Sequence, residues 1–134
     1  MRHSASKARL LLLFVLIAAP QAHADDEAVA HAYFMAGDLE QAYRSYRALA
    51  EVGYPHYLNI LGDWHARGIG VPASDLMAHV WYSLSAAQKN PQGMEMKARI
   101  GDRLSPDQIR QSREIAERYA QKYLAPYISQ WSLD

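Results

Sequence analysis

Few side chains in this 134-residue chain could do chemistry, and none of them is a cysteine. Beyond residue 24 the chain holds four histidines, and no two of them stand four residues apart, as paired zinc ligands on one helix would. These histidines are His31, His56, His65 and His79. The sequence therefore predicts no metal site and no cofactor.

Two serines near a histidine, Ser83 and Ser85 with His79, are the residue types that a hydrolase uses. A hydrolase places its nucleophilic serine where a histidine base can reach it, often at a strand-to-helix turn. Here no strand is expected, and both serines fall within a predicted helix. The Gly-x-Gly at residues 68–70 also lacks the strand and the Lys-Ser/Thr of a phosphate-binding loop. We therefore predict no catalytic residue and no enzyme activity.

The first 24 residues have the pattern of a cleavable signal peptide. Three basic residues precede an apolar run from Leu10 to Ala19, which is too short for a transmembrane helix of about 18 residues or more. Ala22-His23-Ala24 matches the small-x-small pattern of a cleavage site. We expect a mature chain that starts at Asp25, has no stable membrane insertion and no lipid anchor, and resides in a bacterial periplasm.

The charge of the predicted mature chain argues against a nucleic-acid partner. The leader holds three of the 14 basic residues and none of the 14 acidic ones, so residues 25–134 carry a net charge of −3. Residues 25–75 contain eight acidic and three basic side chains, whereas residues 76–134 contain six acidic and eight basic ones. The acidic half could steer a basic partner, although such an excess is also ordinary for a solvated helical surface. About 110 residues predict a single domain.

Helical segments must position these side chains, and they repeat along the chain with a period of 36 residues. The pairs are Ala42 with Ala78, Tyr46 with Tyr82, Ala50 with Ala86, and Gly53-Tyr54-Pro55 with Lys89-Asn90-Pro91. Upstream the offset falls to 31, which pairs Tyr33 with Trp64 and Gly37 with Gly68, as though a five-residue loop were absent. A period of this length indicates a helical solenoid.

The stretch from Tyr57 to Asn90 is expected to form a helix, a loop and a second helix. Gly68 suits the left-handed position that ends a helix, and Pro72 cannot continue one. Ser74 or Asp75 then offers an oxygen that caps the second helix. Small residues in both helices let the backbones approach closely, while bulky aromatic neighbours fill the core.

This stretch resembles the Sel1-like repeat, a relative of the tetratricopeptide repeat. The matching residues are Leu61, Gly62, Gly68, Gly70, Pro72, Ala78, Trp81, Tyr82, Ala86 and Ala87. The resemblance implies an all-α fold, a short right-handed α/α solenoid of about two and a half helix-turn-helix repeats. We expect repeats at about residues 27–54 and 55–90, and a degenerate one at 91–125. Ser105-Pro106-Asp107-Gln108 is a strong helix start and predicts a C-terminal capping helix.

The resemblance also implies a binding module, because the first helix of each pair lines a concave groove in such arrays. On the helix from Pro55 to Arg67 we expect an exposed polar stripe that binds a peptide or protein, although any amphipathic helix shows such a stripe to water. Its members are His56, Asn59, Asp63 and Arg67. Tyr57 stands where the family commonly has alanine, so we expect either a partly filled groove or a helix pair that is splayed apart. His65 replaces the usual tyrosine and is expected to pack, bonding through one ring nitrogen.

The C-terminal tail from Tyr127 to Asp134 is too apolar for a simple disordered end. We expect it either to fold back over the last helix or to bind a partner, with Trp131 as a contact residue. The sequence thus predicts an exported adaptor or assembly factor that binds another protein or a peptide, and a homodimer is one way to cover the terminal helices. The alternative is an immunity-type inhibitor of a secreted enzyme, which would need a tight, apolar interface.

Overall fold

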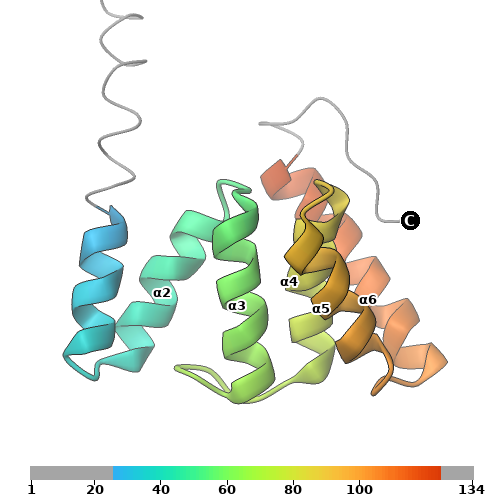
Figure 1. Cartoon of the computed structure of the whole chain (residues 1–134), viewed down its shortest axis with the longest axis horizontal. Coiled ribbons are helices and arrows are strands. Elements are labelled where there is room, and N and C mark those ends of the chain that lie inside the picture. Colours follow the sequence, from blue (N-terminus) through green and yellow to red (C-terminus); the bar gives the residue numbers. More distant parts are fainter. Residues whose placement is uncertain (1–25, 125–134) are drawn as a thin grey trace, which may run out of the picture.

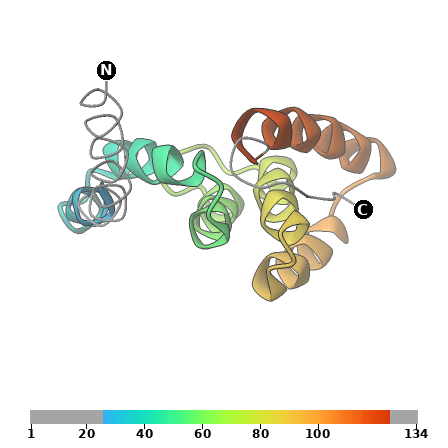
Figure 2. The ribbon, with the colours of Figure 1, turned by 90° about the horizontal axis from the view of Figure 1, so that it is seen from above.

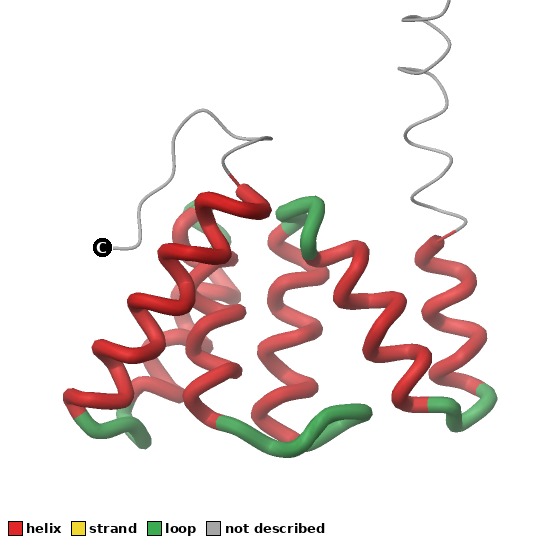
Figure 3. The backbone as a smooth tube through the Cα atoms, turned by 180° about the vertical axis from the view of Figure 1, so that it is seen from behind, coloured by secondary structure: helices red, strands yellow, loops and turns green. Residues whose placement is uncertain are grey.

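The computed structural model describes residues 26–124, which form a row of helices joined by short turns (Figure 1). The elements are a helix over residues 26–35, α2 (Leu39–Ala50), α3 (Pro55–Arg67), α4 (Asp75–Ala87), α5 (Pro91–Gly101), α6 (Pro106–Tyr119) and a π-helical turn η1 (Ala120–Leu124). Within this described part there is no strand, as the colouring in Figure 3 shows. The predicted all-α helical repeat fold is confirmed.

Successive helices alternate in direction along the chain (Figure 1). In sequence they group as the helix 26–35 with α2, α3 with α4, and α5 with α6, but α5 and α6 each pack mainly on α4 and make few contacts with each other. Helix α3 packs against α2 and α4, and α4 packs against both helices of the last pair. Seen from above, the helices up to α4 follow one another in a row, and α5 and α6 lie on opposite sides of α4 (Figure 2). Each pair therefore contacts its neighbour in the chain, as in a solenoid.

The repeat period read from the sequence is visible in the backbone. Gly53 and Lys89, which are 36 residues apart, both have positive φ angles, +94° and +61°. Gly37 and Gly68, which are 31 residues apart, have φ angles of +78° and +70°. A lysine in the left-handed region is unusual. Lys89 nevertheless adopts the positive φ angle that Gly53 has in the preceding repeat, so the two turns share the same backbone geometry.

The helix boundaries follow from local chemistry. Gly68 ends α3 in the left-handed conformation, with φ +70° and ψ +43°. The Ser74 side chain accepts a hydrogen bond from the Met77 N–H and so caps α4. Ser105 and Gln108 form a reciprocal capping box at the start of α6. Each of these starts and stops was expected from residue type alone.

The core lies between the helices of each pair and between neighbouring pairs. Its largest fully buried side chains include Leu58, Leu61, Trp81, Tyr82 and Leu84. The interpretation of the two aromatic residues of α4 as core is confirmed. The small residues of the repeat signature lie at helix contacts, since Ala78 is fully buried and Ala87 nearly so, while Ala86 is half-buried.

No helix in the range 26–124 combines the length and the apolar character needed to cross a bilayer. The predicted leader, residues 1–24, and the predicted contact residue Trp131 lie outside the described residues. These two expectations therefore stay predictions.

Candidate interaction surfaces

The polar stripe predicted on α3 is interrupted in the structure. His56 and Arg67 are exposed, but Asn59 is only 3% exposed. The Asn59 side-chain Nδ2 donates to Asn90 Oδ1 at 3.0 Å, at the start of α5. The prediction that Asn59 is exposed was wrong, because the start of the next repeat packs against this side of α3 and uses the amide as an interhelical contact.

Asp63 is also engaged in a contact within the fold and is not fully available at the surface. It is half-buried, and its carboxylate accepts a hydrogen bond from the hydroxyl of Tyr82 on α4. Burial raises the pKa of Tyr82, and the bond to Asp63 adds to that rise, so the phenol stays protonated as the donor. The expected four-residue ladder is thus reduced to an exposed residue at each end of α3, His56 and Arg67.

His65 behaves as a packing residue, as predicted. It is 5% exposed, and its Nε2 lies 2.8 Å from the hydroxyl of Tyr43. Its ring also stacks on Trp81, with 6.3 Å between centroids. Burial, with a smaller effect of Arg47, lowers the pKa of His65 to about 4, so the ring is neutral at pH 7. In residues 26–124 no group of three or more metal-ligating side chains comes together.

His79 and Ser83 of α4 form a buried polar cluster with Ser112 of α6. His79 Nδ1 lies 2.5 Å from Ser112 Oγ, and Ser83 Oγ donates to the His79 carbonyl at 2.6 Å. All three side chains are at most 5% exposed, as is Ser85. Burial, followed by Lys97 and Arg113, lowers the pKa of His79 to about 4. A substrate has no access to these serines, so their arrangement ties α4 to α6.

A surface that the sequence reasoning did not single out lies at the N-terminal end of the row of helices. Four large apolar side chains are exposed there by 38–71%, and we call them the N-terminal rim. They are Tyr33, Phe34, Met35 and Leu39. Of the other large apolar side chains in the described residues, Val29, Tyr54 and Met94 are also exposed. Four of the seven exposed large apolar side chains in the described residues thus lie within residues 33–39.

The repeat explains why the rim is exposed. Trp64 on α3 is 8% exposed, because Tyr46 and Phe34 of the preceding pair cover it at ring-centroid distances of 5.2 and 5.7 Å. Tyr33 is its counterpart at the offset of 31 residues, and it is 38% exposed. No helix pair precedes Tyr33 within residues 26–124, so Tyr33 is left uncovered, whereas Phe34 of the rim also contacts Trp64 of the next repeat. The equivalence of Tyr33 and Trp64 in the repeat alignment is the sequence signal from which this surface could have been predicted.

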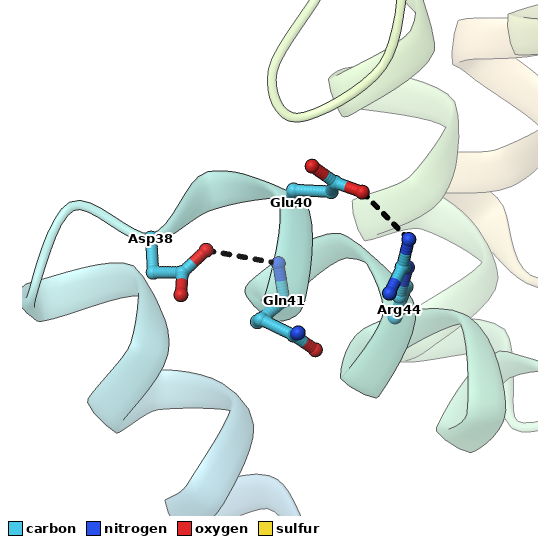
Figure 4. Close-up of polar contacts among 4 residues, drawn as sticks. All are labelled: Asp38, Glu40, Gln41 and Arg44. Atoms are coloured by element: carbon cyan, nitrogen blue, oxygen red, sulfur yellow. Dashed lines mark hydrogen bonds and ion pairs between the residues drawn. The ribbon is translucent and has the colours of Figure 1, made fainter.

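Polar groups at the start of α2 border the rim (Figure 4). Asp38 caps the helix, and its Oδ1 accepts from the Gln41 N–H at 3.3 Å. Glu40 and Arg44 form an exposed ion pair at 2.6 Å. Such a surface pair contributes little to stability, but it places charge beside the apolar side chains. An apolar centre with a charged margin is typical of a protein-binding surface.

The opposite end of the row is different in character. The exposed side chains of α6 are polar or charged, and Asp107 and Arg110 form an ion pair at 3.1 Å. Among the buried positions of α6 are Ser112 and Ala116 on the side that faces the row. Helix α6 therefore covers one side of α4 and presents a polar face to solvent.

A cleft of about 240 Å³ lies between the helix 26–35 and α2. Most of its walls are apolar, and Val29, Ala48, Leu49 and Val52 contribute to them. Asp26 and Ser45 complete the lining. The cleft lies near the start of the helix 26–35, whereas the rim residues lie at the end of that helix and at the start of α2.

Comparison with known proteins gives one informative similarity. No family model matches the chain, and no curated protein matches it. A solved structure does match, that of a protective antigen present in uropathogenic Escherichia coli strains that displays an SLR fold. The TM-score is 0.69 and the identity 25%, and the match covers 79% of this chain and 24% of that chain. This chain therefore spans about a quarter of that protein's length.

Proposed function

The chain has the Sel1-like repeat fold of a helical protein-interaction module, and we propose that it is an exported, non-catalytic adaptor that binds another protein through its N-terminal rim. The observation that carries the proposal is the exposure of Tyr33. The equivalent position in the next repeat is Trp64, which is buried. Exposed apolar groups bordered by polar residues are typical of protein interfaces. Aromatic and methionine side chains are enriched in such interfaces.

The partner that fits this surface presents an apolar helix or segment with basic residues beside it. Inside the chain, Trp64 is the position equivalent to Tyr33, and it is covered by aromatic side chains of the preceding helices, those of Tyr46 and Phe34. The half of the chain that carries the rim, residues 25–75, has eight acidic and three basic side chains. Complementary charge would speed association and select the partner, whereas the apolar contact would supply most of the affinity.

The concave stripe is a second, smaller contact in this proposal. His56 and Arg67 remain exposed on α3 and could meet the same partner where it extends past the rim. Asn59 and Asp63 act within the fold, and Trp131 as a contact residue remains a prediction. We propose no metal, no cofactor and no nucleic acid.

The inhibitor alternative gains support from the apolar character of the rim. An inhibitor of a secreted enzyme needs a tight interface with an apolar centre, whereas an adaptor can work at about micromolar affinity. The dissociation constant for the captured partner separates the two functions. A dissociation constant near 1 nM for a captured enzyme would favour the inhibitor function. A dissociation constant near 1 µM for a captured envelope protein would favour the adaptor function.

A pull-down from periplasmic extract tests the proposal. The full-length chain is expressed for export and used as bait, beside a variant with Tyr33→Glu and Met35→Glu. A charge-matched control carries Gln111→Glu and Gln121→Glu, which add the same two charges on the polar C-terminal side. We expect the rim variant to lose the dominant partner and the control to keep it.

Retention of the partner by the rim variant would overturn the rim as the binding surface. If a variant with His56→Ala and Arg67→Ala then lost that partner, the binding surface would lie on α3. The mass of the purified bait tests export in the same experiment, because cleavage after Ala24 leaves a chain that begins at Asp25.

A further inference from the structure

Tyr33 and Trp64 are equivalent in the backbone as well as in the sequence. The Asp38 N–H donates to the Tyr33 carbonyl at 3.0 Å, and the Ile69 N–H donates to the Trp64 carbonyl at 2.9 Å. Each bond reaches back over five residues and closes the end of a helix next to a glycine of positive φ. The rim residue Tyr33 therefore occupies the place in its helix that Trp64 occupies in α3.

The contacts of α3 show what covers such a place. Two rings of α2, the second helix of the preceding repeat, lie against two consecutive residues of α3. Tyr46 packs edge-on against Trp64, with 5.2 Å between the ring centroids. The hydroxyl of Tyr43 lies 2.8 Å from Nε2 of His65, and these two rings also meet edge to face at 5.5 Å. The cover is thus a helix with two ring side chains three residues apart.

The next junction in the chain repeats this arrangement with different residues. His79 and Tyr82 of α4 stand 36 residues after the two rings of α2, and they meet two consecutive residues of α5. Ile100 is 5% exposed and belongs to one buried apolar cluster with Tyr82. A Cβ atom added to Gly101 would lie 3.6 Å from the His79 ring. Both junctions therefore use the same two ring positions.

At the N-terminal rim the two equivalent places hold Tyr33 and Phe34. These side chains are 38% and 40% exposed, whereas Trp64 and His65 in α3 are 8% and 5% exposed. Phe34 meets Trp64 of the next repeat at 5.7 Å between ring centroids, and its remaining surface faces solvent. The rim thus exposes a surface that the chain covers, at both of its internal junctions, with a helix of one kind.

We propose that the partner of the rim presents a helix with two ring side chains three residues apart, and that this helix stacks on Tyr33 and Phe34 as α2 stacks on α3. The inference rests on the proposed function of the rim and names the recognition element of its partner. Ring pairs that meet edge to face attract one another in addition to the gain from the area that they bury. Phe34 has no polar atom where His65 has Nε2, so the ring over Phe34 needs no hydroxyl.

A second copy of this chain does not offer such a helix at its C-terminal end. The N-caps of α2, α4 and α6 are Asp38, Ser74 and Ser105. In α2 and α4 the two rings stand five and eight residues after the cap, and they are already used at the internal junctions. In α6 the same two positions hold Arg110 and Arg113, which are exposed. The partner is therefore a different protein.

A library of helical hairpins displayed on phage tests the proposal. One helix of each hairpin carries random residues along one face, including the positions five and eight after its N-cap. The bait is the full-length chain, expressed for export. Each selected hairpin is then measured against the parent, against Tyr33→Ala, and against Gln111→Ala, a control at an exposed position of α6. Circular dichroism shows that the variants keep the helical fold.

We expect the selected hairpins to carry rings at both positions. Tyr33→Ala should weaken their binding at least about tenfold, as truncation of a central aromatic contact does, and Gln111→Ala should leave it unchanged. Alanine in place of either hairpin ring should cost a similar factor. Hairpins without the ring pair, hairpins that bind Tyr33→Ala as tightly as the parent, or a library that yields no binder would overturn the proposal. Self-association of the parent that Tyr33→Ala abolishes, measured by sedimentation velocity, would also overturn it, because the rim would then hold a second copy.

The periplasmic pull-down separates a failure of this helix from a failure of the rim. If the variant with Tyr33→Glu and Met35→Glu loses its partner there while the library yields no ring pair, the rim is the binding surface and the ring-bearing helix is wrong. If that variant keeps its partner, the proposed function itself fails.

Discussion

The ring of Tyr82 occupies the space that a side chain at position 62 would need. A Cβ atom added to Gly62 would overlap the Cε1, Cδ1 and Cζ atoms of that ring. Tyr82 cannot simply turn away, because it is fully buried and its hydroxyl donates to Asp63 on the same helix as the glycine. Helices α3 and α4 can therefore approach this closely only with glycine at position 62.

We predict that Gly62→Ala destabilises the protein by about 1–3 kcal/mol, the usual cost of overfilling a packed core. The overlap must be relieved by separating α3 from α4 or by breaking the Tyr82–Asp63 hydrogen bond. Urea unfolding followed by far-UV circular dichroism measures the change in the free energy of unfolding.

Gly101→Ala is the matched control for that substitution. Gly101 is also helical, but a Cβ atom there would meet nothing closer than 3.6 Å. The control should be neutral or stabilise by up to about 1 kcal/mol, because alanine favours the helix. If both alanine variants were equally stable, the close contact between Gly62 and Tyr82 would not limit the packing.

Asn59→Ala is predicted to affect stability and to leave partner capture unchanged. The substitution removes the Nδ2 donor that binds Asn90 Oδ1 at 3.0 Å between α3 and α5. Loss of one such buried bond costs about 1–2 kcal/mol. The unfolding midpoint in urea gives the stability, and the periplasmic pull-down gives the binding. His56→Ala, at an exposed position of the same helix, should change stability by less than about 0.5 kcal/mol.

The repeat signature allowed the fold to be predicted, because its residues are chosen by local geometry. Gly68 must adopt a left-handed conformation, and Ser74 must cap α4, whatever the partner of the protein is. The core position of His65 could also be predicted, since it takes the place of a packing tyrosine. The roles of Gly68 and Ser74 depend on residues within the same repeat, whereas the hydrogen-bond partner of His65, Tyr43, comes from the preceding repeat.

The exposed surface was harder to predict, because exposure depends on which helix comes next. Asn59 falls on the polar side of α3, but it is buried because α5 begins with Asn90 beside it. Tyr33 has the pattern of a core residue, but it is exposed because no repeat covers it in the described part of the chain. Ser112 could not be paired with His79 from spacing, since 33 residues and another helix separate them.

Gly70→Ala is predicted to be more destabilising than Gly37→Ala. Both glycines have positive φ angles, +66° and +78°, so each alanine carries a backbone penalty of about 1 kcal/mol. A Cβ atom on Gly70 would in addition overlap the Leu39 carbonyl, whereas one on Gly37 would meet nothing within 4 Å. The difference between the two variants in urea unfolding isolates the packing of this loop against α2. Equal destabilisation would mean that the loop can move away freely.

The two buried histidines predict a loss of stability in mild acid. His65 and His79 have pKa values lowered from the ordinary 6.5 to about 4, in both cases mainly by burial. Between these pH values the unfolded chain binds more protons than the folded one, so stability falls as the pH drops from 6.5 towards 4. Above pH 6.5 the histidines are neutral in both states and add no pH dependence. Each should contribute a slope of up to about 1 kcal/mol per pH unit.

Urea unfolding at pH 7.0, 6.0 and 5.0 measures that slope. His79→Gln should flatten it, because glutamine does not titrate, although the variant loses some stability at pH 7 where the ring contacts Ser112. If His79→Gln had the same slope as the parent, protonation of the cluster between α4 and α6 would not cause the acid sensitivity, and the carboxylates would have to account for it.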